Sequence, residues 1–229
     1  IREGGAMDIL AGVGPMGLAA IDYILHCDRK PARLVVTDID QARLDRAGQI
    51  LSQAEAEKNG VQLTYLNTGS VADPVSALLA QNGGKGYDDE LCFAPVAAVV
   101  EQADAILGED GCLNFFAGPS NPAFNARFNF YNVHYASTHV VGTSGGNTAD
   151  MVDQGLLTPA ILVTHIGGLN SVVETTLNLP QVPGGKKLIY TNIQLPLTAI
   201  SDFRAQQDPL FHALADICDR HNGLWSPEA

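Results

Sequence analysis

Three glycines near the start of the chain have a spacing that suits phosphate binding. Residues 8–20 (DILAGVGPMGLAA) begin with an apolar run, continue with Gly12, Gly14 and Gly17 in the pattern G-x-G-x-x-G, and end in an alanine-rich stretch. This pattern predicts a strand, a tight turn and a helix, in which Gly12 allows the turn, Gly14 admits a pyrophosphate and Gly17 allows close packing. The phosphates would bind free amides at the helix N-terminus, and Pro15 suits the first helical turn.

An acidic residue ends the next apolar run. Residues 33–38 (RLVVTD) predict a second strand that closes with Asp38, 26 residues after Gly12. A carboxylate about 20 residues beyond such a turn can accept hydrogen bonds from a ribose. Strand, turn, helix, strand and acid occur together and in order, which predicts a dinucleotide site. In the alternative interpretation the glycines only shape a turn and Asp38 caps the next helix, which explains each feature singly but not the set.

The acid also bears on which dinucleotide binds. A carboxylate that accepts both ribose hydroxyls repels a 2′-phosphate, so Asp38 favours NAD over NADP without excluding NADP. Ile39 follows it in the turn. Arg43 lies five residues beyond Asp38 and has two interpretations. It lies near the adenine ribose, where its charge weakens the preference for NAD, or it is a solvated arginine on a helix face.

The composition restricts the classes of partner. The chain has 229 residues and a net charge of −12, which argues against nucleic acid and anionic membranes because both need clustered Lys and Arg. Its four cysteines are widely scattered, which predicts reduced thiols. No apolar run reaches the length of about 18 residues that spans a bilayer, so we expect a cytoplasmic protein. Residues 1–5 lead at once into a core strand, which is typical of a piece of a longer chain.

Strands and helices alternate along the chain up to about residue 143. Apolar runs predict strands at 8–10, 33–37, 61–66, 89–93, 111–116 and 138–143. Helical periodicity predicts helices at 16–26, 41–59, 74–81 and 94–107. Parallel strands need crossover connections, so the alternation predicts an α/β fold with a doubly wound, six-stranded parallel sheet in the order 3-2-1-4-5-6. We assign residues 1–147 to this dinucleotide-binding Rossmann domain.

Two segments do not follow this alternation. Residues 124–135 contain five aromatics and are expected to form a short strand and a helical turn over the sheet edge. Residues 148–229 are expected to be a C-terminal extension that does not continue the β–α–β pattern. Its expected elements are a helix at 149–154, an apolar run at 160–164, a Gly/Pro-rich insertion at 167–187, a strand at 188–191 and helices at 201–206 and 209–221.

Three motifs resemble the coenzyme half of medium-chain, zinc-type alcohol and polyol dehydrogenases: Gly12-Val13-Gly14-Pro15-Met16-Gly17, Val35-Val36-Thr37-Asp38 and Val163-Thr164-His165. Residues 7–23, 33–40 and 188–203 are more narrowly similar to the L-sorbose 1-phosphate reductase branch. The resemblance covers essentially the whole chain. It implies that a GroES-like catalytic domain precedes the nucleotide domain in the intact enzyme, that this chain lacks that domain, and that the C-terminal extension packs on it.

By this resemblance, the intact enzyme would transfer hydride between a nicotinamide cofactor and a polyol or ketose, such as the sugar phosphate L-sorbose 1-phosphate. A zinc ion would polarise the carbonyl group. Its ligands would be Cys, His and Glu of the preceding domain, so we expect no catalytic residue and no zinc ligand in this chain, which alone would have little activity. His134, His139 and His165 lack a second convergent ligand, and no metal site is assigned to them.

The resemblance extends the cofactor site to loops that follow later strands. Phe93, Ala94 and Pro95 would line the nicotinamide side, although they also suit a turn that caps the next helix. Other glycines close loops at the same edge. The predicted cofactor-binding residues are Gly12, Gly14, Pro15, Met16, Gly17, Asp38, Ile39, Arg43, Phe93, Ala94, Pro95, Gly118, Gly142, Thr143 and Ser144.

The sixth strand is expected to be an open edge of the sheet. Exposed edges pair with other chains, and in the resembling enzymes this edge joins two subunits. We therefore expect residues 138–141 to form a two-fold homodimer interface, with coverage by the following segment as the alternative. Two other functions stay open: a non-catalytic dinucleotide sensor and an S-adenosylmethionine-dependent methyltransferase, against which the third glycine, Gly17, argues.

Overall fold

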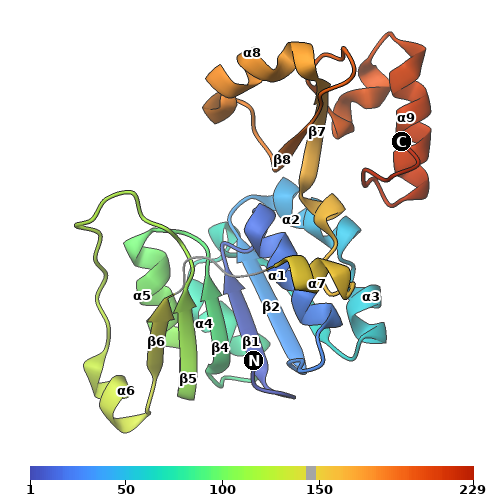
Figure 1. The fold of residues 1–229 in the computed structure, drawn as a ribbon. Coiled ribbons are helices and arrows are strands. Elements are labelled where there is room, and N and C mark those ends of the chain that lie inside the picture. The colour runs from blue at the N-terminus through green and yellow to red at the C-terminus, as the bar shows by residue number, and fades with distance from the viewer. Residues whose placement is uncertain (143–147) are drawn as a thin grey trace. The chain divides into compact units, whose positions relative to one another are not determined.

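The structure, a computed structural model, describes residues 1–142 and 148–229. The chain forms two compact units, Ile1–Leu157 and Thr158–Ala229, which are described one at a time (Figure 1). Not one helix in the described part of the chain combines the length and the apolar character that crossing a bilayer requires.

The boundary between the units falls after residue 157, later than the expected boundary after residue 147. Helix α7 (Ala149–Asp153) and the turn that follows it group with the first unit. The Leu156 amide donates to the Met151 carbonyl at 2.8 Å, so the chain stays bonded to this helix for three residues beyond it. The sequence pattern changes at the helix, whereas the packing changes only after it.

Six parallel strands form the sheet of the first unit in the predicted order, β3-β2-β1-β4-β5-β6. The strands are β1 (Ala6–Leu10), β2 (Arg33–Asp38), β3 (Gln62–Asn67), β4 (Tyr87–Cys92), β5 (Leu107–Phe115) and β6 (His139–Gly142). The strand order reverses between β1 and β4, which is where ligands bind in sheets of this type. This confirms the predicted doubly wound architecture.

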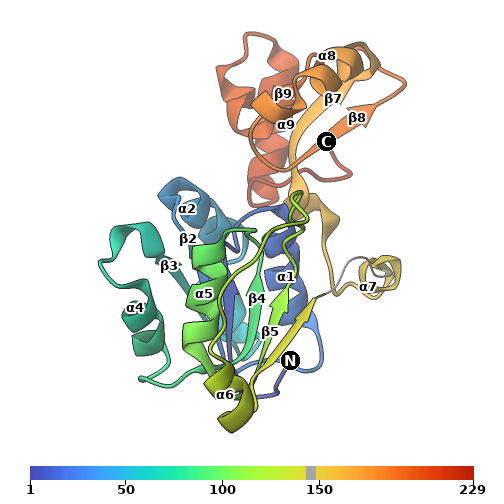
Figure 2. The same cartoon turned by 90° about the vertical axis from the view of Figure 1, so that its left-hand side faces the viewer.

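Helices cover both faces of the sheet. They are α1 (Pro15–His26), α2 (Gln41–Ile50), α3 (Gln53–Lys58), α4 (Pro74–Gln81) and α5 (Ala97–Ile106). Figure 2 shows α4 and α5 on one face and α1 on the other. The predicted apolar face of α1 is buried, with Leu18, Ile21, Ile24 and Leu25 in the core. All five residues of β1 are also buried, because this central strand lies between the two helix layers.

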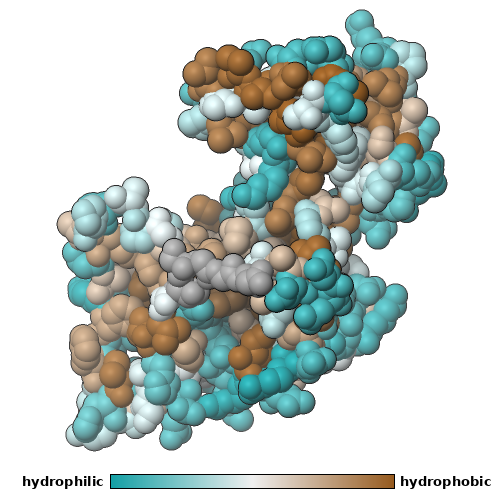
Figure 3. Space-filling view, in the orientation of Figure 1, coloured by the Kyte–Doolittle hydropathy of each residue, from teal (hydrophilic) through white to brown (hydrophobic). Residues whose placement is uncertain are grey.

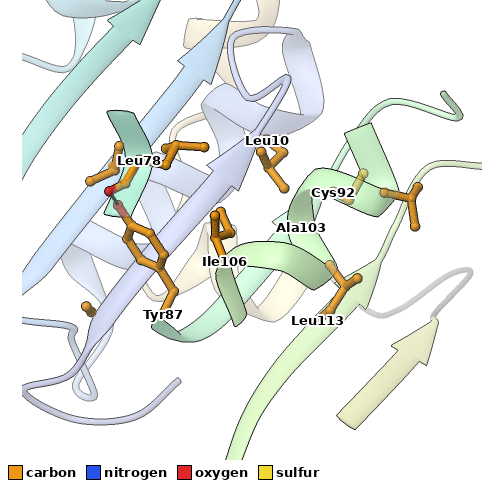
Figure 4. Close-up of a cluster of buried hydrophobic side chains, with 10 residues drawn as sticks. Leu10, Leu78, Tyr87, Cys92, Ala103, Ile106 and Leu113 are labelled. Atoms are coloured by element: carbon orange, nitrogen blue, oxygen red, sulfur yellow. Dashed lines mark hydrogen bonds between the residues drawn. The ribbon is translucent and has the colours of Figure 1, made fainter. Parts of the chain in front are cut away.

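Apolar side chains fill the space between the sheet and helices α4 and α5. Leu10 of β1, Cys92 of β4 and Leu113 of β5 meet Ile106 of α5 in this cluster (Figure 4). Tyr87 is fully buried among them and donates its hydroxyl hydrogen bond to the Leu78 carbonyl at 2.7 Å. This layer fixes the strands that carry the loops of the candidate site.

The helix predicted at 41–59 is two helices in the structure. It breaks between Ile50 and Gln53 because the Ser52 hydroxyl accepts a hydrogen bond from the Glu55 amide at 3.2 Å and caps α3. The break rotates the apolar face, so that Ala54 is exposed and Ala56 is buried. Serine competes well for backbone donors, which the periodicity of apolar residues does not reveal.

Strands β4 and β5 both begin earlier than predicted, and α5 begins later. Gly86 lies against Gly108, and a Cβ at Gly86 would come within 2.5 Å of the Gly108 backbone. The two strands therefore approach each other before their apolar runs start. The register then shifts between Tyr87 and Asp89. Residues 93–96 form an irregular loop, so the first turn of the predicted helix at 94–107 is absent.

The segment between β5 and β6 contains one short helix, α6 (Phe130–Tyr135), and the predicted short strand does not appear in its described residues. Phe124 instead stacks on Phe115 with ring centroids 5.7 Å apart. Phe124, Ala126 and Phe128 pack against the core cluster as an extended stretch. These alternate apolar residues pack on the core cluster and do not join the sheet as a strand.

The second unit contains a three-stranded sheet in the order β8-β7-β9. Its elements include β7 (Val163–Gly168), α8 (Val172–Leu177), β8 (Lys186–Tyr190) and β9 (Thr198–Ala199). Strands β7 and β8 are parallel and α8 lies between them in the chain, so this part does continue the β–α–β pattern, contrary to prediction. The short, β-branched α8 has little helical signal, and glycines and prolines flank it.

Helix α9 (Pro209–Arg220) and the 3₁₀ turn η5 (Ile200–Ala205) close the core of the second unit. Phe203 is fully buried and its ring lies 5.4 Å from that of Phe211. The Trp225 indole N–H donates to the Tyr190 hydroxyl at 2.9 Å. The remaining 3₁₀ turns are η1 (Thr68–Ser70), η2 (Pro159–Leu162), η3 (Leu169–Ser171) and η4 (Leu179–Gln181).

Candidate cofactor site

The glycine turn joins β1 to α1 and has the close packing that its spacing predicts. A Cβ at Gly17 would come within 2.0 Å of the Gly12 carbonyl oxygen, so only glycine lets α1 approach the turn this closely. A Cβ at Gly12 would come within 2.5 Å of Ile9 and 2.9 Å of Val36. The Gly12 amide donates to the Thr37 carbonyl at 2.8 Å, which fixes the turn to the end of β2.

The middle glycine leaves open space above the turn. A Cβ at Gly14 would meet only the Nη2 atom of Arg43, at 3.7 Å. Gly14 is the N-cap of α1 and supplies no side-chain acceptor, and Pro15 follows it at the first helical position. The first amides of a helix have no intrahelical acceptor. An anion above Gly14 would therefore meet these amides and the positive end of the helix dipole, with Met16 exposed beside it.

The residue before the first glycine has a conformation that the sequence did not predict. Ala11 has φ of 54°, in the left-handed region, whereas Gly12 does not. This conformation costs an L-residue about 1–2 kcal/mol. Strained backbone of this kind is often found at ligand sites. The pattern assigned the turn to Gly12, and an alanine gives no signal that would have located the strain.

Asp38 ends β2 at the same edge of the sheet as the glycine turn. It is 8% exposed, and its Oδ1 atom accepts hydrogen bonds from the amides of Ile39 at 2.8 Å and Asp40 at 3.1 Å. Among the described residues no donor reaches Oδ2. The N-cap of α2 is Asp40, which accepts from the Arg43 amide at 3.2 Å. The interpretation in which Asp38 caps the next helix is therefore wrong.

Arg43 brings a positive charge to the glycine turn. Its Nη2 atom lies close to the space above Gly14, as the 3.7 Å approach to the Cβ position shows. The side chain is exposed, and no described carboxylate forms an ion pair with it. Ile39, also exposed, lies between Asp38 and α2, and a Cβ at Gly69 would come within 3.2 Å of it. The sequence did not single out Gly69 and the adjoining turn η1 as part of this wall.

The loop after β4 lies beside the glycine turn. Leu10 and Cys92 are partners in the ladder, and the Phe93 amide donates to the Leu10 carbonyl at 3.0 Å. Ala94 and Pro95 continue the loop, but the N-cap of α5 is Val96, so the predicted alternative of a capping turn does not apply to them.

The loop after β5 is hydrogen-bonded to the end of β4. The amides of Phe116 and Ala117 both donate to the Cys92 carbonyl, at 3.1 and 3.0 Å. The rings of Phe93 and Phe116 lie 5.1 Å apart and form one aromatic wall. Gly118 follows, exposed and with open space where a Cβ would lie.

The last predicted residues belong to the end of β6. Gly142 is the partner of Phe115 in the ladder, so it ends at the same edge of the sheet. Thr143 and Ser144 lie outside the described residues. The structure thus brings every other predicted cofactor-binding residue to the carboxyl edge of the parallel sheet.

The histidines do not come together. His139 lies 3.2 Å from Asp110, and His165 contacts the Thr164 hydroxyl at 2.9 Å in the other unit. Burial and the nearby Lys187 lower the pKa of His165. Within residues 1–142 and 148–229, no group of three or more His, Cys, Asp or Glu side chains is arranged to hold a metal ion.

Comparison with known proteins finds relatives that match the whole chain. No protein-family model matches the chain. It is 52% identical, over its whole length, to mannitol-1-phosphate 5-dehydrogenase of Aliivibrio fischeri, of which it covers 56%. It is 46% identical, also over its whole length, to L-sorbose 1-phosphate reductase of Klebsiella pneumoniae, of which it covers 54%. The chain spans about half the length of the curated relatives it matches.

Solved structures agree with these relatives. Zinc dependent alcohol dehydrogenase 2 from Streptococcus pneumonia matches 85% of this chain and 54% of its own, with a TM-score of 0.64 and 21% identity. An alcohol dehydrogenase from E. coli CFT073, crystallised with NADH, matches 82% of this chain and 52% of its own, with a TM-score of 0.63 and 15% identity. The chain has the fold of about half of these alcohol dehydrogenase chains. The predicted resemblance, including its L-sorbose 1-phosphate reductase branch, is confirmed.

The residues of this fold suit a dinucleotide but not zinc. Gly14 leaves open space of the kind that a pyrophosphate needs against the first amides of α1, and the hydrogen bonds that Asp38 accepts from described residues all go to Oδ1. In contrast, the described residues contain no cluster with the donors that zinc prefers. No catalytic step through zinc follows from this chain.

Proposed function

We propose that the chain binds NAD as the coenzyme part of a dehydrogenase that acts on a polyol phosphate or ketose phosphate. One observation carries the proposal: Gly17 packs on Gly12 while Gly14 stays open, next to Asp38 at the end of β2. The names of the two relatives, for mannitol 1-phosphate and L-sorbose 1-phosphate, support the substrate class. The NADH in a structure of the same fold supports a nicotinamide cofactor.

The adenosine half of the cofactor would lie between the glycine turn and the end of β2. The pyrophosphate binds over Gly14, where the amides of α1 and the Arg43 guanidinium both face it. The ribose hydroxyls donate to Asp38, whose Oδ1 is already oriented by two backbone amides. Ile39 contacts the adenine. A 2′-phosphate would meet the Asp38 carboxylate, which favours NAD, and Arg43 moderates this preference without reversing it.

The nicotinamide half would lie along the ends of β4, β5 and β6. Phe93 and Phe116 form an apolar wall that excludes water from the ring, with Ala94 and Pro95 beside them. Gly118, Gly142, Thr143 and Ser144 supply backbone around the carboxamide. The bound nicotinamide carries the hydride chemistry, and these residues hold and orient it.

The remaining parts of the reaction are assigned to residues outside this chain. The zinc ion, the substrate pocket and the catalytic groups belong, in this proposal, to another domain of the intact enzyme, and the chain alone is inactive. The four cysteines are free thiols, which supports a reducing, cytoplasmic location.

The second unit would dock on that other domain through helix α8. Val173 and Leu177 are four residues apart in α8, so they share one face, and they are 70% and 74% exposed. Figure 3 shows apolar surface over this part of the second unit. A helix of a stable domain normally buries such a face, which supports a partner surface here.

A homodimer would form through the outer edge of β6. This strand ends the sheet, and Val140 and Val141 are each 46% exposed. Thr138, which was expected to share the interface, is buried within the unit and does not contribute. An exposed edge with apolar side chains favours pairing with an identical edge across a two-fold axis.

Calorimetric titration of the 229-residue chain with NADH, NADPH and S-adenosylhomocysteine tests the function. NADH should bind more tightly than NADPH, and Asp38→Ala should weaken NADH by about 30-fold, because about 2 kcal/mol of charged hydrogen bonding is lost. Asp28→Ala removes an exposed carboxylate away from the turn and should leave affinity unchanged. Tighter binding of NADPH would contradict the role of Asp38. Binding of S-adenosylhomocysteine alone, or of no ligand, would contradict the proposed function.

A further inference from the structure

Two carboxylic acids lie side by side inside the sheet, within the strands that carry the glycine turn and the Phe93 loop. Asp8 of β1 and Glu90 of β4 are partners in the parallel ladder, and they are 0% and 1% exposed. Neighbouring strands lie about 4.8 Å apart, and ladder partners point to the same face. The two carboxyl groups therefore occupy one small volume in the centre of the first unit.

This volume belongs to an apolar layer. Side chains two positions apart in a strand share a face, so Asp8 faces the same way as Leu10, and Glu90 the same way as Cys92. Figure 4 shows Leu10 and Cys92 within the cluster that α4 and α5 cover. Val35, the partner of Asp8 on β2, belongs to the same cluster. The carboxyl groups are consequently surrounded by hydrocarbon and removed from water.

No hydrogen-bond donor compensates for this burial. All four carboxyl oxygens of Asp8 and Glu90 lack a hydrogen-bond partner among the described residues. The hydroxyl of Tyr87 on β4, which interacts with the charges of Asp8 and Glu90, donates instead to the Leu78 carbonyl of α4. An unpaired, buried carboxylate costs several kcal/mol on general grounds, so such groups take up a proton instead.

The charged and titratable groups around the pair do not favour two negative charges. On β2, the Arg33 guanidinium donates outward, to the side chain of Gln62 and the carbonyl of Gln81. On α5, Asp104 adds a further negative charge, and its Oδ2 atom accepts from the Asn129 amide at 2.8 Å.

The other neighbours supply no positive charge either. Glu101 of α5 and Arg127 form an exposed ion pair with each other, at 3.1 Å. Helix α4 contains no charged residue. On β4 the other titratable groups of this cluster are the Tyr87 hydroxyl and the Cys92 thiol, and the pKa of each is itself raised by burial and by the charges of Asp8 and Glu90.

The net effect of the surroundings is to raise the pKa of both carboxyl groups. Burial raises the pKa of Asp8 well above its usual range, and the nearby Ile9 amide opposes this with a smaller effect. Burial also raises the pKa of Glu90, with further contributions from the charges of Asp8 and Asp104. Two carboxylates in one site resist simultaneous ionisation.

We propose that Asp8 and Glu90 hold one proton between them in the folded unit, so that one carboxyl group of the pair is neutral beside its ladder partner. The proton comes from solvent when the strands pair, and it returns to solvent when they separate. In the unfolded chain both groups have ordinary pKa values near 4 and are ionised at neutral pH. Formation of the β1–β4 ladder is therefore coupled to proton uptake.

The coupling has a defined sign. Above about pH 4 the folded unit binds one proton more than the unfolded chain, so stability falls as pH rises until the native pKa of the pair is passed. Alkaline conditions thus loosen the strands β1 and β4, whose ends carry the glycine turn and Phe93.

The first test is the pH dependence of unfolding of the 229-residue chain in denaturant. Between about pH 5.5 and about pH 7.5 the unfolding equilibrium constant should rise by about tenfold per pH unit because of this proton. The single substitutions Asp8→Asn and Glu90→Gln keep nearly the same side-chain shape, and each should remove this rise of the unfolding equilibrium constant with pH. Glu57→Gln removes an exposed carboxylate of α3 and should keep the wild-type slope. An identical slope in wild type and in both variants would overturn the proposal.

The second test needs no variant to fold. The infrared carbonyl stretch of a protonated carboxylic acid should be present in the wild-type chain at neutral pH and should shift in D₂O. In Asp8→Asn and Glu90→Gln, where these fold, the same band should be lost or displaced, and in Glu57→Gln it should persist. A wild-type spectrum without this band would show both groups ionised and would overturn the proposal.

Discussion

Ala11 is the residue at which local strain and the cofactor site coincide. Its φ of 54° is unfavourable for alanine, and glycine adopts it freely. We expect Ala11→Gly to stabilise the chain by about 1 kcal/mol, because the strain relieved exceeds the added entropy of the unfolded glycine. Denaturant unfolding measures this change.

The control for Ala11 is the same chemical change in an ordinary helix. Ala20→Gly lies within α1, where φ is negative, and should destabilise the chain by about 1 kcal/mol. If both variants lose stability equally, the turn does not hold Ala11 in a strained conformation.

Arg43 lies over Gly14 because the Asp40 cap sets where helix α2 begins.

At the scale of elements, a single hydroxyl decides that α2 and α3 are separate helices. The Ser52 side chain accepts from the Glu55 amide and caps α3. Ser52→Ala should destabilise the first unit by about 1 kcal/mol, which is the usual contribution of such a cap. The measurement is the free energy of unfolding in urea.

Ser120→Ala provides the comparison for this cap, since Ser120 is exposed and lies in a loop. Its effect should stay within about 0.5 kcal/mol. Equal effects of the two substitutions would mean that the cap contributes nothing and that the break in the helix has another cause.

At the scale of the whole molecule, the edge strand β6 should determine assembly. Val140→Lys places a charge on the exposed edge, which natural sheets use to prevent pairing. We expect the wild-type chain to sediment as a dimer at high concentration and Val140→Lys to sediment as a monomer.

The comparison substitution for assembly is Val173→Lys on α8, a more exposed valine outside β6. It should leave the dimer intact. Wild-type chain that stays monomeric at every concentration would contradict the proposed interface, as would a dimer that only Val173→Lys disrupts.

Much of the first unit could be predicted because its signals are local. The helix at 74–81 has the predicted bounds, with Asp73 as its cap and Pro74 at its first position. The glycine spacing and the acid at the end of β2 likewise depend on residues close together in the chain. The strand order followed from the rule that parallel strands joined by crossovers wind in one direction.

The sequence by itself determined the doubly wound sheet, the glycine turn and the candidate dinucleotide site, because short-range spacing and side-chain periodicity encode them. Only the tertiary structure decided which distant residues meet. It paired β7 with β8 in parallel, placed Arg43 over Gly14 and put Asp8 beside Glu90. Such neighbours depend on strand register and on helix packing, which join residues far apart in the chain and leave no periodic signal along it.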